Sequence, residues 1–411
     1  MKIQHILFGS LSMLATVSSG AEETSLADLS ARLRQLEGKV NNYEAQYGPL
    51  NSSSTSSGAA TAGGFDSSFL NPGSGSGISR WFEKTSIGAY GEFTFGIDRS
   101  GDDEVDFQRF VIYLNHEFND RLRFVSELEF EHALIGGDAP GAVELEQAYL
   151  EYDLTSDFQV RAGLFLVPVG LINEIHEPPT FFGVERPRVE SDIIPTTWRE
   201  NGIGVTKKFQ NGLSFDGTFS TGLDLDSGNG DLRSSRTNGA QADGDSGSFT
   251  GRVAYTGIEG LRLTAFGQYN TNISRGDNTD GTLYGATLEY SRGGFGLRAL
   301  FAKWDIDDIS AESGISLDPG ASFSDVDEQF GWYVEPSYTW HLSEESKIGV
   351  FARYSESEFF ESGQRVEENV LSLGVNYWPV DNVVFKADYQ VADETGDENA
   401  EQFNLGFGFQ F

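Results

Sequence analysis

The chain has 411 residues, with 28 Lys and Arg against 63 Asp and Glu, and its formal net charge is −35. Such an acidic chain argues against nucleic acid as a partner, because phosphate binding needs a basic surface. The absence of Cys excludes disulfide frameworks, thiolate metal sites and cysteine catalysis. With 49 Gly, 13% aromatic residues and only 11 Pro, the composition favours a large β-protein with polar loops over a helical soluble enzyme.

Residues 1–21 have the layout of a secretory signal peptide. Lys2 supplies the charged start, residues 6–17 supply the short apolar run, and residues 19–21 (SGA) supply a small-residue cleavage site. A membrane anchor is the alternative, but the run is too short and too interrupted to span a bilayer as a helix. We therefore expect this segment to direct export and to be removed.

Residues 22–47 carry a heptad pattern. Their apolar residues recur at alternating spacings of three and four, as in the seam of a coiled coil: Leu26, Leu29, Leu33, Leu36, Val40, Tyr43 and Tyr47. A helix this short is marginal alone, so the seam predicts partners; packing on the floor of a barrel is the alternative. Residues 48–79 are rich in Gly and Ser and predict a flexible linker, which places the domain boundary near Arg80.

From Thr85 onward, apolar and polar residues alternate with a period of two, as in half-buried β-strands. We predict sixteen strands, at 85–98, 106–118, 122–132, 143–153, 158–166, 201–209, 213–222, 248–256, 261–270, 282–292, 295–304, 329–341, 347–357, 366–378, 383–393 and 402–411. Their connections alternate between tight turns and long polar loops. This layout predicts an all-β fold, a 16-stranded antiparallel transmembrane β-barrel over residues 80–411, with the turns in the periplasm and the loops outside.

The alternation also assigns the two faces of each strand. The apolar parity would face lipid, and the charged parity would surround the lumen. Aromatic residues near predicted strand ends fit the girdles of membrane interfaces: Tyr152, Trp304, Trp340, Tyr377, Trp378 and Tyr389. A soluble sandwich would show the same alternation with the faces reversed. The signal peptide, the strand number, the unequal loops and the apolar last strand ending in Phe411 favour the barrel.

Residues 167–200 form the longest predicted loop and the most apolar one. Such a loop needs a surface to pack on, so we expect it to fold into the barrel and narrow the pore. Residues 161–171 (RAGLFLVPVGL), continuing through Glu185 and Arg186 to 198–205 (WRENGIGV), resemble the phosphate-selective porin O/P family of bacterial outer-membrane channels. The resemblance implies a trimeric 16-stranded porin with an inward third loop. The heptad segment resembles the periplasmic coiled coil of dicarboxylate-type trimeric porins.

The charges depart from the basic funnel that this resemblance implies. The predicted outer loops are strongly acidic, at Asp98, Asp102, Asp103, Glu104 and Asp106; Asp305, Asp307 and Asp308; Glu356, Glu358 and Glu361; Asp393, Glu394, Asp397 and Glu398. An acidic mouth repels anions. The candidate channel-lining residues are Arg109, Arg123, Arg161, Glu174, Glu177, Glu185, Arg186, Arg188, Arg252, Arg298 and Arg353. Their inward arginines, with Arg262, would form either an anion track or lumenal salt bridges with neighbouring glutamates.

We therefore expect an outer-membrane porin for passive diffusion of small hydrophilic solutes or ions, assembled as a homotrimer among outer-membrane lipid and lipopolysaccharide. Two alternatives stay open: a structural protein whose coiled coil contacts the cell wall, and an anion channel selective for phosphate or dicarboxylates. No HExxH, Walker or nucleophile-elbow motif indicates an enzyme. No cofactor is expected; residues 224–231 start like a Ca²⁺ loop but Ser235 replaces its last ligand, which leaves only loose Ca²⁺ binding to acidic loops open.

Overall fold

The computed structural model describes residues 84–98, 103–135, 140–242, 244–274, 279–307, 309–394 and 397–411. The predicted signal peptide (1–21), coiled-coil helix (22–47) and linker (48–79) lie outside the described residues. In the described part of the chain, no helix has both the length and the apolar character needed to cross a bilayer.

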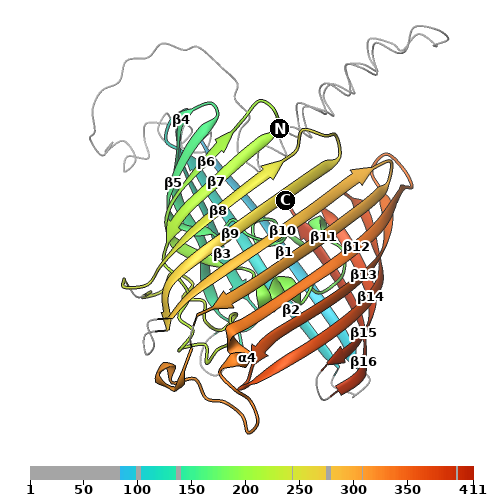
Figure 1. The fold of residues 1–411 in the computed structure, drawn as a ribbon. Helices are drawn as coiled ribbons and strands as arrows, with labels where there is room; N and C mark the ends of the chain where they lie inside the picture. Colours follow the sequence, from blue (N-terminus) through green and yellow to red (C-terminus); the bar gives the residue numbers. More distant parts are fainter. Residues whose placement is uncertain are drawn as a thin grey trace, which may run out of the picture. The chain divides into compact units, whose positions relative to one another are not determined.

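Sixteen antiparallel strands close into one barrel (Figure 1). They are β1 (Thr85–Asp98), β2 (Glu104–Glu117), β3 (Leu122–Glu131), β4 (Val143–Thr155), β5 (Phe158–Leu166), β6 (Arg199–Lys208), β7 (Leu213–Ser220), β8 (Gly247–Tyr255), β9 (Leu261–Ser274), β10 (Thr279–Arg292), β11 (Phe295–Ile306), β12 (Glu328–His341), β13 (Lys347–Glu361), β14 (Gln364–Val380), β15 (Val383–Glu394) and β16 (Asp397–Gln410). Because β1 pairs with β16, no strand edge stays unpaired. The predicted fold class and strand number are confirmed.

Several strands reach further into the outer region than we predicted. β13 and β14 are joined by Ser362 and Gly363 alone, both with positive φ (51° and 90°), which is the backbone geometry of a tight hairpin turn. The expected long acidic loop at this point is therefore wrong. The ladder of backbone hydrogen bonds continues beyond the apolar belt, where polar side chains can face water. Acidic residues expected in outer loops lie on strands instead: Asp98, Glu104, Asp106, Asp305, Glu356, Glu358, Glu361, Asp393, Glu394, Asp397 and Glu398.

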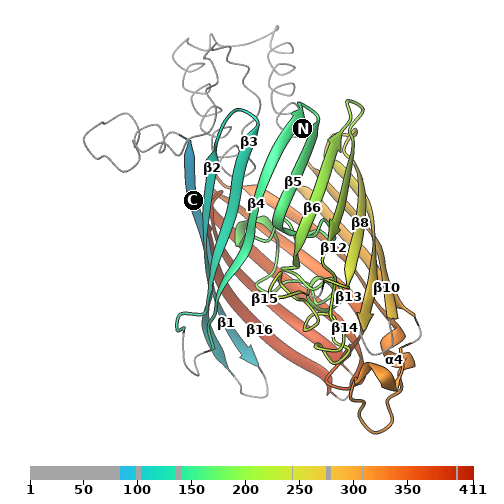
Figure 2. The same cartoon turned by 90° about the vertical axis from the view of Figure 1, so that its left-hand side faces the viewer.

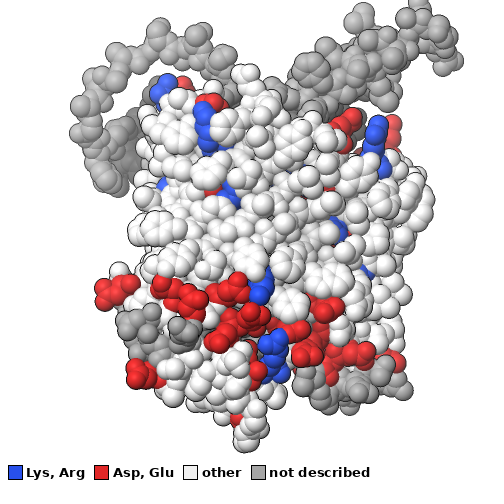
Figure 3. Space-filling model, viewed as in Figure 1, with Lys and Arg blue, Asp and Glu red and all other residues white. Residues whose placement is uncertain are grey.

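The outer and inner faces of the barrel differ as the alternation predicts. Large apolar side chains such as Phe301, Phe385 and Leu405 are 39–50% exposed on the outside. Charged side chains such as Glu335 and Arg353, of the opposite parity, are at most 4% exposed. On the side that Figure 3 shows, the middle belt is almost free of charge, and Asp and Glu gather at the end of the barrel near helix α4 (Ser324–Asp327). Charge lines the interior rather than the outer belt.

Two of the six aromatic residues assigned to the interface girdles lie inside the barrel. Trp304 is fully buried, and its ring centroid lies 6.0 Å from that of Trp198. Trp378 is 5% exposed, and its ring packs edge-on against Phe182 at 5.6 Å. The other four, Tyr152, Trp340, Tyr377 and Tyr389, are 39–47% exposed. The assignment of Trp304 and Trp378 is wrong because an apolar loop supplies them with a partner inside the lumen.

That interior is filled by two connections, the third loop (residues 167–198, between β5 and β6) and the fourth loop (residues 221–246, between β7 and β8). Figure 2 shows both ribbons, in green, between the near and far walls. They share one apolar core with the wall strands, built from Val189, Ile193, Ile194, Trp198, Leu223, Leu225, Leu232, Leu283, Trp304 and Tyr333. The third loop ends two residues earlier than predicted, because Arg199 and Glu200 already belong to β6.

Glycines on the inner face of the wall make room for the third loop. A Cβ at Gly408 of β16 would lie 2.2 Å from the Cβ of Pro178, and one at Gly331 of β12 would lie 2.9 Å from Val189. The alternation of Gly with large apolar residues in the last strand therefore matches an outer apolar face with an inner face that receives the loop.

Candidate functional site

The third loop leaves and rejoins the wall at a neck held by Asn173. The Asn173 side-chain amide donates to the carbonyl oxygens of Val167 (2.8 Å) and Trp198 (3.0 Å). Its Oδ1 accepts from the backbone N–H of Trp198 at 2.6 Å. These bonds join the end of β5 to the start of β6, so the chain between them forms a closed lobe.

The tip of this lobe, residues 179–183, is bound to the opposite wall through its backbone. Five successive carbonyl oxygens accept hydrogen bonds from wall side chains: Pro179 from Trp378 (3.2 Å), Thr180 from Arg298 (2.8 Å), Phe181 from Asn376 (3.2 Å), Phe182 from Arg353 (2.7 Å) and Gly183 from Lys386 (2.7 Å). The donors come from β11, β13, β14 and β15. Three wall cations, Arg298, Arg353 and Lys386, thus each give a donor to the backbone of the loop.

A buried carboxylate fixes the middle of the lobe. Glu190 is fully buried and accepts from the backbone N–H groups of Leu171 and Ile172, both at 2.7 Å. It also accepts from the hydroxyl of Tyr333 at 2.6 Å. Burial raises the pKa of Glu190, while these hydrogen bonds oppose that shift. The indole N–H of Trp304 adds a bond to the carbonyl of Ile193 at 2.9 Å.

The fourth loop packs against residues 195–197, near the end of the third loop. Arg233 donates to the carbonyl oxygen of Thr196 at 2.7 Å, and Arg236 donates to those of Pro195 and Thr197 at 3.2 Å. Burial and the neighbouring Arg233 lower the pKa of Arg236 to about 9. Both guanidinium groups therefore serve to hold backbone.

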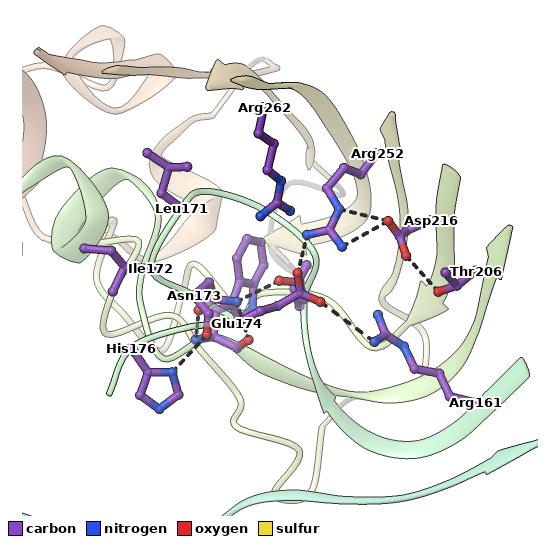
Figure 4. Close-up of polar contacts among 12 residues, drawn as sticks. Arg161, Leu171, Ile172, Asn173, Glu174, His176, Thr206, Asp216, Arg252 and Arg262 are labelled. Carbon is purple, nitrogen blue, oxygen red and sulfur yellow. Dashed lines mark hydrogen bonds and ion pairs between the residues drawn. The ribbon is translucent and has the colours of Figure 1, made fainter. Parts of the chain in front are cut away.

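One group of charges, here called the lumen cluster, stays in contact with water between the neck of the third loop and the near wall (Figure 4). Glu174 reaches Arg161 at 3.8 Å and also pairs with Arg252. Arg252 in turn pairs with Asp216 at 3.0 Å. The remaining members form a second set of ion pairs on the neighbouring strands: Arg262 with Glu289 (3.4 Å) and Glu289 with Arg298 (3.9 Å). Four guanidinium groups thus face three carboxylates.

Three of these members are only partly buried. The side chains of Glu174, Arg262 and Arg298 are 26%, 29% and 28% exposed. Arg262 and Arg298 lie on the charged, inward face of their strands, and Glu174 lies on the inward third loop. The water in contact with these side chains is therefore inside the lumen. The lumen cluster joins β5, β7, β8, β9, β10 and β11 with the third loop.

The other candidate residues lie in separate places. Among the wall arginines, Arg109 pairs with Glu92 (2.8 Å) and Glu129 (3.4 Å), Arg123 with Asp153 (2.9 Å) and Glu151, and Arg353 with Glu335 (2.7 Å). In the third loop, Arg188 pairs with Asp192 and Glu368, both at 3.2 Å, and Glu177 accepts from the hydroxyl of Tyr113 at 3.1 Å. Each wall arginine named from the sequence therefore has a carboxylate partner.

Glu185 and Arg186 belong to the third loop but not to the lumen cluster. Burial and the carboxylates of Glu92 and Asp388 raise the pKa of Glu185 to about 6. Burial and the charge of Arg109 lower the pKa of Arg186 to about 10. Their charged forms are thus less favourable than those of exposed side chains.

Sequence reasoning missed Asn173 and Tyr333, which position the loop. The partners of Asn173 lie 6 and 25 positions away, and Tyr333 meets Glu190 across 143 positions. Local periodicity has no signal for contacts of this kind. The place of Asn173 within the Pro-rich third loop was the single usable hint for this residue.

Residues 88–411 match the family described as phosphate-selective porin O and P. A relative from Aquifex aeolicus (strain VF5), described as an uncharacterized protein, is 31% identical over 355 residues, which cover 79% of this chain and 80% of that protein.

Solved porin structures share the fold at low identity. Salmonella typhi OmpF in complex with daunomycin has a TM-score of 0.54 at 14% identity, covering 80% of this chain and 97% of that one. Pseudomonas putida OprB has 0.54 at 11%, covering 82% and 96%. OmpT of Vibrio cholerae, in its trimer form, has 0.50 at 14%, covering 80% and 100%. The chain belongs to the phosphate-selective porin O and P family, and it is an outer-membrane porin that forms a water-filled channel for passive diffusion of small hydrophilic solutes.

Proposed function

We propose that solutes cross the barrel beside the neck of the third loop, and that the lumen cluster lines the narrowest charged part of this path. The tip of the loop is bonded to β11, β13, β14 and β15, which leaves the side of β5 to β10 for passage. The partial exposure of Glu174, Arg262 and Arg298 supports this assignment, because water reaches them inside the barrel.

We also propose that the channel prefers cations or selects weakly between ions. The observation that carries this proposal is the pairing of every named wall arginine with a carboxylate. Four guanidinium groups against three carboxylates leave little net charge in the lumen cluster. The acidic outer end then sets the sign of the field that an approaching ion meets (Figure 3).

Selectivity for phosphate or dicarboxylates is the second candidate. It is favoured by the single excess guanidinium group of the lumen cluster and by the exposure of Arg262 and Arg298. Guanidinium groups bind carboxylate and phosphate oxygens in a bidentate manner. This candidate requires an anion to displace the carboxylates that now occupy those donors.

Planar bilayers test both candidates with the full chain purified in detergent. We expect stepwise ohmic openings, and a reversal potential in a KCl gradient with the sign of cation preference. Pure protein that gives no openings would contradict the assignment of the conduction path. A strong preference for phosphate over chloride and potassium would establish the second candidate instead.

We further propose a homotrimer whose segments 22–47 associate as a periplasmic coiled coil. The heptad spacing of that segment supports it, as does the likeness in fold to OmpT of Vibrio cholerae in its trimer form. Chemical cross-linking of the full chain and of a chain lacking residues 22–79 tests the proposal. Trimers should form in the full chain and weaken in the deletion; equal trimer formation in both would show that the barrel alone assembles.

The same deletion tests a tethering role through contact with the cell wall. If permeation survives while envelope attachment is lost, tethering is an added role of the porin. If envelope attachment is unchanged, the tethering role is refuted. Contact with lipid and lipopolysaccharide is proposed for the apolar belt and its exposed aromatic residues, such as Trp340 and Tyr389.

A further inference from the structure

A second group of polar side chains, here called the His176 cluster, lies where the third loop meets β3 and β4. It consists of Glu127 of β3, Glu146 of β4 and His176 of the loop. One potential ligand atom from each residue lies within 4.8 Å of the other two. The three residues are 7%, 0% and 3% exposed, respectively, so water has little access to them.

Each of the three residues has one buried polar atom without a hydrogen-bond partner. These atoms are Oε2 of Glu127, Oε2 of Glu146 and Nε2 of His176. The Nε2 of His176 and the Oε2 of Glu146 are 3.7 Å apart, which is too long for a hydrogen bond. Leaving a buried polar atom unpaired costs about 1–3 kcal/mol, and more for a charged group. Three such atoms on residues whose potential ligand atoms lie within 4.8 Å of one another indicate a site for a ligand that all three residues contact.

Each of these side chains is held by its other polar atom. Gln147 donates to Oε1 of Glu127 (2.7 Å), Thr197 donates to Oε1 of Glu146 (3.0 Å), and Nδ1 of His176 lies 3.2 Å from the carbonyl oxygen of Asn173. Figure 4 shows this contact between His176 and Asn173. A carbonyl oxygen can only accept, so Nδ1 carries the proton, and Nε2 presents its lone pair on the side of Glu146. Outer partners that fix the tautomer and orientation of ligands in this way are a regular feature of protein metal sites.

The cations that act on the cluster are bonded elsewhere. The charges of Arg109 and Arg199 both influence Glu146. However, Arg109 forms its ion pairs with Glu92 and Glu129, and Arg199 pairs with Glu144. Glu177 adds a third carboxylate close by, and its Oε2 is also buried and unpartnered. The cluster is therefore rich in negative charge without a guanidinium group of its own.

We propose that Glu127, Glu146 and His176 bind a divalent transition-metal ion of the zinc type, which fastens the third loop to β3 and β4. One imidazole nitrogen with two carboxylate oxygens suits Zn²⁺ and its neighbours, whereas Ca²⁺ and Mg²⁺ favour oxygen ligands throughout. Zinc lies about 2.0–2.2 Å from such atoms, which places tetrahedral ligand atoms roughly 3.3–3.6 Å apart. The separation of 3.7 Å between His176 and Glu146 is close to this value.

The site has a direct link to the channel. His176 follows Asn173, which holds the neck of the loop, and Glu174, which belongs to the lumen cluster. An ion bound by His176 would therefore restrain the backbone that carries Glu174. The inference does not depend on the sign of selectivity or on the conduction path.

Metal titration of the full chain in detergent tests the proposal. The protein is stripped with EDTA, and binding of Zn²⁺ is followed by calorimetry and that of Co²⁺ by its visible absorption. We expect one tight ion per chain and a Co²⁺ spectrum of low coordination number. His176→Gln and Glu146→Gln should each weaken binding by at least the roughly 10–100-fold that loss of an outer partner causes.

The matched control is His341→Gln, which removes an exposed histidine at the end of β12. It should bind as the unaltered chain does. All variants keep the acidic outer end, so binding that survives His176→Gln unchanged would belong to that surface and would overturn the proposal. Failure of the unaltered chain to bind Zn²⁺ or Co²⁺ more tightly than His176→Gln would also overturn it. Circular dichroism and the heat-dependent gel shift of the barrel confirm folding, and Glu127→Gln serves as the third variant if Glu146→Gln does not fold.

Discussion

Replacing Glu174 by Gln removes one negative charge from the lumen cluster with little change in volume. Glu174 pairs with Arg161 at 3.8 Å and with Arg252, and its side chain is 26% exposed. The substitution leaves Arg161 without the one acidic partner described for it, and it leaves Arg252 with Asp216 alone. The path beside Glu174 should therefore become more favourable for anions and less favourable for cations.

The size of the effect follows from Coulomb's law. A univalent ion passing about 5 Å from the lost charge in water feels about 0.8 kcal/mol. Screening at 0.1 M salt, where the Debye length is about 10 Å, reduces this to about 0.5 kcal/mol. That energy changes the permeability of each ion about twofold, upward for the anion and downward for the cation. The ratio of cation to anion permeability should therefore fall about fivefold.

Reversal potentials in planar bilayers under a KCl gradient measure this ratio. The matched control is Asp381→Asn, which removes one negative charge from the exposed turn between β14 and β15, where Asp381 pairs with Lys347 at 3.0 Å. The control should leave the ratio nearly unchanged. An unaltered ratio in Glu174→Gln, with normal conductance, would refute our reasoning, because it would show that ions do not pass within a few ångströms of this carboxylate.

Three further predictions concern the packing of the third loop. Tyr333→Phe deprives buried Glu190 of its hydroxyl donor, so urea unfolding of the barrel in detergent should show a loss of about 1–3 kcal/mol. Gly408→Ala places a Cβ 2.2 Å from Pro178, so the loop tip should shift and single-channel conductance should change. The pKa of Glu185, raised to about 6 from its ordinary 4.5, means that ionisation opposes packing of the loop. The stability due to this group should be complete below about pH 4.5 and should fall by up to about 2 kcal/mol as pH rises through 6, so Glu185→Gln should flatten the dependence measured between pH 5 and 7.5.

The first two of these changes have controls in the same barrel. Tyr338→Phe alters an exposed tyrosine on the lipid face and should leave stability unchanged. Gly251→Ala introduces a Cβ with no heavy atom within 4 Å, so its conductance should equal that of the unaltered channel. If Gly408→Ala conducts as Gly251→Ala does, the tip of the loop does not limit flow. If Glu185→Gln keeps the pH dependence, another buried carboxylate causes it.

The tryptophans show most clearly what the pattern of residue types along the strands does not predict. Trp340 is exposed on the belt as expected, whereas Trp304 and Trp378 face the third loop inside the barrel. The residue type and the place near a strand end are the same in all three. What differs is the neighbour across the lumen, which comes from a distant part of the chain. The acidic residues of β13 illustrate a second limit, because composition resembles a loop where backbone pairing continues.

At the candidate site, too, the sequence predicted one part of the arrangement and the structure decided the rest. The alternation indicated that Arg109, Arg161, Arg252 and Arg353 point inward, and it left open whether they form an anion track or ion pairs. The structure pairs all four with carboxylates, and the partners come from other strands and from the third loop. Charge alone does not predict such pairing, because it depends on which residues the strand register places side by side.

The amino-acid sequence alone determined the barrel, its sixteen strands and which face of each strand meets lipid. These properties are local. Each side chain of a strand faces either lipid or the lumen, and the pleat makes this alternate every two residues, so the pattern can be followed along a short stretch of sequence. The tertiary structure decided where the third loop binds, which arginines remain in contact with water and which side chains converge around His176. Contacts such as that of Val184 with Asp388 join positions 204 apart, and no short period in the chain records them. They arise when closure of the barrel brings the opposite wall within reach of the loop.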